Sequence, residues 1–127
     1  MIIKKLNKSG NWKTYWTKEL KNALNKSSNS TTVGQNLILE TDTFNVWSIH
    51  LKSGHSLPFH KHNKPYFYIA INNGKSRSFY ADGSVIETEY IKDDIMHFKG
   101  LNEHNSFIHN LENIGETTLI FTTVEFK

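Results

Sequence analysis

Residues 54–74 read GHSLPFHKHNKPYFYIAINNG, and the interpretation of the whole chain starts from this stretch. It places His60 and His62 one residue apart, shortly before the apolar run 66–71. Side chains at positions i and i+2 of a strand point to the same face, so both imidazoles are expected to enter one space. An unpaired polar group costs free energy in an apolar interior. The pair therefore either lies at a sheet rim, solvated or hydrogen-bonded, or forms half of a metal site.

From residue 37 onward the sequence predicts strands throughout. The expected strands are 37–41, 44–52, 57–62, 66–72, 75–81, 84–91, 95–99, 105–111 and 117–126. Glycine-containing turns separate several of them, at 72–74, 81–83 and 113–115. Short, regularly spaced strands indicate an antiparallel sandwich or closed barrel rather than βαβ units. The chain is thus expected to hold one β domain over residues 37–127.

Residues 1–36 are expected to form an N-terminal extension. Residues 1–10 are polar and are predicted to lack regular structure. A helix is expected at about residues 14–25, where Trp16, Leu20 and Leu24 share one face and Thr14 can cap the start. This helix is expected to lie against the outside of the barrel or across a subunit interface.

The charge distribution argues against a nucleic-acid partner. The formal net charge is +3, but residues 1–30 hold +6 and the remainder of the chain holds −3. The excess is a lysine-rich segment rather than a basic patch with interleaved aromatic residues. No apolar run approaches the roughly 18 residues of a membrane helix, and the N-terminus lacks the apolar core of a signal peptide. The chain has no cysteine, and a cytoplasmic location is expected.

The spacing of glycines and histidines resembles the first motif of the cupin superfamily. That motif is a glycine, five residues, His-x-His, three or four residues, a glutamate, six residues and a glycine. Four positions fall on the pattern, namely Gly54, His60, His62 and Gly74. Phe67 or Tyr66 stands where the glutamate is expected, depending on the spacing used.

The second cupin motif ends in a histidine, three residues and an asparagine, which His109 and Asn113 match. Its proline is absent, and Gly100 lies farther from His109 than is usual in the family. Over roughly residues 44–126 the chain resembles small single-domain bacterial cupins of uncharacterised function. The resemblance implies an all-β fold, a double-stranded β-helix (the cupin jelly-roll barrel), here with one short N-terminal α-helix.

The resemblance also implies that His60, His62 and His109 share one barrel mouth and bind a divalent transition metal (zinc, iron, nickel or manganese). Three imidazoles leave coordination positions open for water or substrate. The missing glutamate removes the usual charged ligand, since Phe67 cannot coordinate and Tyr66 coordinates only as a phenolate. Metal-free cupins act as sugar epimerases and binding modules, so a metal-free pocket stays open as the alternative.

Two further residues are candidates for moving protons in the site, His97 and Tyr66. His97 lies on the predicted strand 95–99 and either faces inward, as a fourth ligand or an acid/base group, or lies at the rim. Glu103 and His104 fall in the insertion before His109, where exposure is expected and a return to the metal is the alternative. The remaining histidines, His50 and His55, are expected on the surface.

Arg77 is the only arginine and a candidate substrate-binding residue. It shares a strand face with Lys75 and Phe79, and its planar guanidinium suits a carboxylate or phosphate. If that face points inward, the ligand is expected to be anionic. The alternative is a surface ion pair with Glu87 or Glu89.

These features leave several functions open on one fold. The first is a metal-dependent enzyme of the dioxygenase, isomerase or lyase type, acting on a small and possibly anionic metabolite. The others are a non-catalytic small-molecule-binding cupin and a metal-free isomerase or epimerase. A homodimer is expected in each case, because Trp47 and similar residues are expected on the outer face and leave apolar surface to bury.

Overall fold

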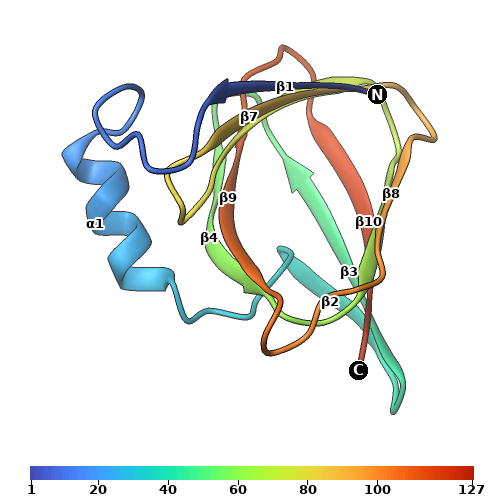
Figure 1. Cartoon of the computed structure of the whole chain (residues 1–127). Coiled ribbons are helices and arrows are strands. Elements are labelled where there is room, and N and C mark those ends of the chain that lie inside the picture. The colour runs from blue at the N-terminus through green and yellow to red at the C-terminus, as the bar shows by residue number, and fades with distance from the viewer.

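The computed structural model describes all 127 residues and contains ten strands and one helix. Two five-stranded antiparallel sheets face each other and form a barrel (Figure 1). The first sheet has the order β1 (Ile2–Asn7), β7 (Val85–Tyr90), β6 (Gly74–Phe79), β9 (Phe107–Asn113) and β4 (Ser56–His62). The second has the order β2 (Asn36–Glu40), β3 (Phe44–Leu51), β10 (Leu119–Phe126), β5 (Tyr66–Ala70) and β8 (Ile95–Phe98). The predicted antiparallel all-β architecture with one short helix is confirmed.

The expectation that residues 1–10 lack regular structure was wrong, because residues 2–7 form strand β1. It pairs with β7 from Ile2↔Glu89 to Asn7↔Val85 and forms one edge of the first sheet. Most of its side chains are exposed, so the segment carries little of the apolar alternation by which a strand is recognised. Its stability comes instead from backbone pairing with a distant partner and from Asn7, whose side-chain amide donates to the carbonyl of Gly83 at 2.8 Å.

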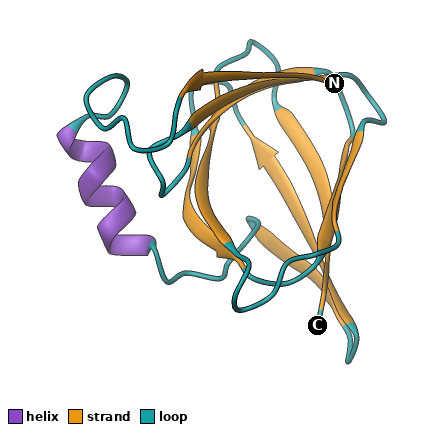
Figure 2. Ribbon diagram, viewed as in Figure 1, coloured by secondary structure: helices purple, strands orange, loops and turns teal.

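The only helix, α1 (Lys18–Ser27), starts four residues later than expected. Thr17 rather than Thr14 caps it, since the Thr17 hydroxyl accepts the backbone N–H of Leu20 at 3.1 Å. The helix lies outside the barrel, beside the first sheet (Figure 2). No helix in the structure is long and apolar enough to span a membrane.

Two apolar clusters hold the fold together. One fills the barrel interior between the sheets and contains Ile49, Leu51, Leu57, Ala70, Tyr90, Leu111, Leu119 and Phe121. The other joins the outer face of the first sheet to the segment before the helix and contains Trp16, Phe59, Phe79 and Val85. Leu20 and Leu24 of α1 pack against this second cluster. The first sheet is therefore covered on both faces, and its outward-facing aromatic residues are buried.

Candidate metal centre

A β-bulge in β4 sets the direction of the two motif histidines. Strands β4 and β9 pair at Leu57↔Leu111 and again at His60↔His109, with a one-residue register shift between these pairs. Pro58 and Phe59 occupy the extra length. Phe59 is buried outside the barrel against Trp16, whereas Leu57 and His60 both face the interior. In a regular strand these two residues, three positions apart, would face opposite sides. The bulge therefore brings His60, and with it His62, into the interior.

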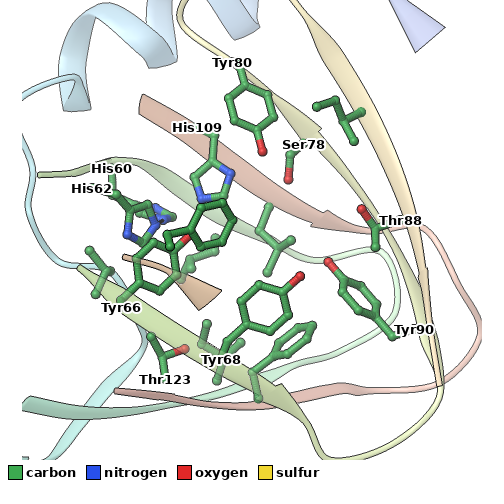
Figure 3. Close-up of a pocket in the computed structure, with 17 residues that line it drawn as sticks. His60, His62, Tyr66, Tyr68, Ser78, Tyr80, Thr88, Tyr90, His109 and Thr123 are labelled. Atoms are coloured by element: carbon green, nitrogen blue, oxygen red, sulfur yellow. Dashed lines mark hydrogen bonds between the residues drawn. The ribbon is translucent and has the colours of Figure 1, made fainter. Parts of the chain in front are cut away.

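His60, His62 and His109 converge at one end of the barrel interior (Figure 3). One donor atom from each lies within 4.8 Å of the others. His60 Nε2 and His62 Nε2 are 3.1 Å apart, and the ring centroids of His60 and His109 are 4.8 Å apart. His60 and His109 face each other directly across the β4–β9 pair. Two neighbouring strands thus present three imidazoles to one point.

Two of the three rings each have a nitrogen that makes no hydrogen bond to the protein. His60 Nδ1 lies 2.8 Å from the carbonyl oxygen of Pro58, so Nδ1 carries the proton and Nε2 presents its lone pair to the cluster. The Nδ1 atoms of His62 and His109 are buried and make no hydrogen bond. Buried polar atoms in native proteins are rarely left unpaired. The Nε2 atoms of His60 and His62, 3.1 Å apart, either share one proton or present both lone pairs to a metal ion, and the second arrangement fits a set of converging imidazoles.

Burial keeps all three imidazoles neutral. It lowers the pKa of His60 from 6.5 to about 4, against the smaller opposing effect of the Pro58 carbonyl. Burial also lowers the pKa of His62 and of His109 well below the usual value, and the charge of neighbouring histidines lowers both further. Because only a neutral imidazole binds a metal, the site is deprotonated and ready to coordinate at neutral pH.

The three imidazoles line a cavity of about 80 Å³ inside the barrel. By the same measure one water molecule requires roughly 10–15 Å³, so the cavity has room for a small ligand. Tyr66 stacks on His62 with ring centroids 4.1 Å apart. The pKa of Tyr66 is raised well above its usual value, chiefly by burial and then by the charges of surrounding tyrosines and Glu125. A neutral phenol therefore lies beside the candidate metal ligands.

Of the two positions left open for His97, the structure has the one outside the barrel interior. Strand β8 pairs with β5 so that Phe98 lies opposite Tyr66 and His97 lies opposite Phe67. Tyr66 and Phe98 line the cavity, which places His97 on the outer face, where it is exposed. Phe67, at the position of the family's glutamate, contacts His97 and Phe126 on that outer face. No carboxylate therefore joins the three imidazoles.

Arg77 also lies outside the cavity. Its Nη2 is 2.6 Å from Glu87 Oε2, which is the surface ion pair left open as the alternative. Arg77 and Phe79 do share a face, but Phe79 is buried outside the barrel against Trp16. Arg77 therefore provides no anion anchor in the cavity. The opposite face of β6 provides Ser78 to the cavity.

The remaining predicted positions lie away from the three imidazoles. Glu103 and His104 are exposed in the loop before β9, and Glu103 accepts a hydrogen bond from Asn63 at 3.2 Å. His50 and His55 are exposed, as expected. Ser78 and Tyr80 also line the cavity, and no sequence pattern marked them as site residues. Their alternation with Arg77 and Phe79 was visible, but the sequence alone did not show which face points inward.

Comparison with known proteins identifies the fold. Neither the protein-family models nor the curated proteins contain a match to this sequence. Among solved structures, a cupin domain from Bordetella pertussis Tohama I is similar at TM-score 0.63 and 16% identity, over 78% of this chain and 96% of that chain. An RmlC-like cupin family protein with a double-stranded β-helix fold from Methanocaldococcus jannaschii is similar at TM-score 0.57 and 21% identity, over 72% and 76%.

An uncharacterised conserved protein with a double-stranded β-helix domain, from Klebsiella pneumoniae subsp. pneumoniae MGH 78578, is similar at TM-score 0.56 and 21% identity, over 81% of this chain and 85% of that chain. These identities establish a shared fold and carry no shared activity. Together with the two facing antiparallel sheets, these likenesses show that the chain has a double-stranded β-helix fold, as these cupin structures do.

Proposed function

We propose that this protein binds one divalent transition metal ion through His60, His62 and His109 and acts on a small oxygenated metabolite in the adjoining cavity. The observation that supports the metal site best is the convergence of three buried, neutral imidazoles whose donor atoms lie within 4.8 Å of one another. An all-nitrogen donor set suits zinc, iron or nickel better than manganese, which prefers oxygen ligands.

When bound in such a site, a metal ion polarises an oxygen of the substrate or lowers the pKa of a coordinated water. The chain itself supplies the remaining parts. The Pro58 carbonyl fixes the tautomer and orientation of His60. Tyr66, held against His62, is a neutral phenol that can donate a proton to a group in the cavity. Leu57, Leu111 and their neighbours form apolar walls of the cavity.

The proposal predicts that metal-free protein, prepared without an affinity tag, takes up one equivalent of zinc, iron or nickel at neutral pH. A calorimetric titration followed by elemental analysis of the dialysed protein measures this directly. The tag must be absent because a histidine tag binds the same metals. Substoichiometric uptake of all three metals would contradict the proposal.

The absence of a carboxylate among the candidate ligands favours one alternative, a non-catalytic cupin that binds a small molecule without metal. In that case the three imidazoles form hydrogen-bonding walls for the ligand. The same titration separates the two functions, because the metal-free alternative predicts no stoichiometric uptake. A metal-free isomerase or epimerase makes the same prediction for the titration and is distinguished from a binding module by turnover.

We also propose that the protein forms a homodimer, and that strand β2 provides the contact. β2 is an edge strand of the second sheet, and its side chains Leu37, Ile38 and Leu39 are 44%, 60% and 49% exposed. Exposed apolar side chains beside an unpaired strand edge are a typical association surface. Trp47, originally expected on the outer face, points inward and donates its indole N–H to the buried Glu125 at 3.3 Å. Trp47 is half-buried and faces inward, so it does not supply the apolar outer surface expected for a dimer contact.

Analytical ultracentrifugation at tens of micromolar is expected to show a dimer for the unmodified chain and a monomer for Ile38→Lys. A charge at position 38 would have to be buried without a partner in the contact. Ile114→Lys is the matched control, because Ile114 is exposed in a turn outside β2 and its replacement should leave the dimer intact. A monomeric unmodified chain would contradict this part of the proposal.

A further inference from the structure

The cavity beyond the three imidazoles is lined by hydroxyl groups and apolar side chains and contains no Asp, Glu, Lys or Arg. The hydroxyl-bearing residues that line it are Tyr66, Tyr68, Ser78, Tyr80, Thr88, Tyr90 and Thr123. Some of these hydroxyls are occupied within the protein. That of Tyr90 is hydrogen-bonded to Ser76 at 2.8 Å, and that of Tyr68 lies 3.6 Å from the sulfur of Met1.

The hydroxyls of Ser78 and Tyr80 remain available. Neither hydroxyl makes a hydrogen bond to another protein group, and both residues line the cavity. Figure 3 shows both directed into the cavity from the same side, next to His109. Tyr80 forms an isolated bridge with His109, and their rings are 5.1 Å apart, so its position is coupled to that of a candidate metal ligand.

We propose that Ser78 and Tyr80 form a second subsite, beside His109 and apart from the point where the three imidazoles converge, that binds a hydroxyl or carbonyl oxygen of the ligand. This inference rests on the proposed function above. The ligand class that follows is a small hydroxy or oxo compound whose charge, if it has one, lies at the imidazole end. A charged group at the Ser78 end would be buried without a counter-charge, which is unfavourable. The cavity volume of about 80 Å³ limits the ligand to a few heavy atoms.

Three probes of equal size test this subsite, namely β-hydroxypropionate, butyrate and β-alanine. They share a carboxylate for the imidazole end and differ at the far end, which is a hydroxyl, a methyl or an ammonium group. Calorimetry on the zinc-loaded protein is expected to show β-hydroxypropionate binding about fivefold to tenfold more tightly than either of the others, as one neutral hydrogen bond would give. In Ser78→Ala and in Tyr80→Phe this preference is expected to disappear, with zinc content unchanged.

Thr122→Val is the matched control, because it removes a hydroxyl from a β10 residue that does not line the cavity. Its preference should equal that of the unmodified chain. Equal binding of the three probes, or a preference that survives in both cavity variants, would overturn the subsite while leaving the metal site intact. Failure of the unmodified chain to take up zinc would instead overturn the proposed function. The same probes titrated into metal-free protein then still test the subsite, and the preference for the distal hydroxyl should persist there at lower affinity.

Discussion

Replacing His60 and His62 together with alanine is expected to abolish stoichiometric zinc binding at neutral pH. The double replacement removes two of the three converging donors and leaves His109 as a single imidazole, which cannot hold a metal ion against water. The exposed loop residues Glu103 and His104 do not reach the site and so cannot compensate. Competition titration against a chromophoric chelator, with elemental analysis, would measure the change from one equivalent to none.

The matched control for this experiment is the double variant His50→Ala, His55→Ala. It also removes two histidines, but both are exposed and lie outside the cluster. It is expected to keep one equivalent of zinc. Circular dichroism of both variants checks that the barrel still folds without the two buried rings. Full zinc content in the His60, His62 variant would place the metal elsewhere on the chain.

The fold was predictable because its signals are local. Glycine-containing turns, short apolar runs and the spacing from Gly54 to Gly74 indicate the strands and their succession. Strand β1 was missed because its pairing with β7 joins residues about eighty positions apart and buries few of its side chains. The helix was expected to start four residues too early for a similar reason. Trp16 belongs to the segment before the helix and is held by the Gly83 carbonyl, a contact that no local pattern reveals.

The candidate site was predicted only in part, because one question about each strand stayed open. Strand alternation tells which residues share a face, but not which of the two faces points inward. For β6, Arg77 and Phe79 share one face, and α1 and Trp16 bury Phe79 outside the barrel. The alternative of a surface ion pair therefore holds for Arg77, and the opposite face of β6 provides Ser78 to the cavity. For β4 the bulge at Pro58–Phe59 reverses the alternation, and only the pairing with β9 reveals it.

Acid is expected to destabilise the metal-free protein between pH 6.5 and about pH 4. The folded state holds His60 with a pKa of about 4, whereas the same ring in the unfolded chain has a pKa near 6.5. Below pH 6.5 the unfolded state therefore binds more protons than the folded state, so the free energy of unfolding falls as the pH falls. This stability is fully present above pH 6.5. His60 alone accounts for a loss of about 3 kcal/mol at pH 4, and the lowered pKa values of His62 and His109 act in the same direction.

Urea unfolding in the presence of a chelator, at several pH values from 7 to 4, measures this loss. His60→Gln is expected to flatten the dependence, because it removes one ring that must charge and relieves the repulsion that His60 exerts on His62 and His109. His55→Gln removes an exposed histidine and should leave the dependence unchanged. Burial raises the pKa of Glu112, and this carboxyl group is present in both variants. Its contribution to the pH dependence is therefore the same in both and does not affect the comparison. An equal free energy of unfolding at pH 7 and pH 4.5, or equal slopes in the two variants, would show that the three imidazoles are not held neutral by burial.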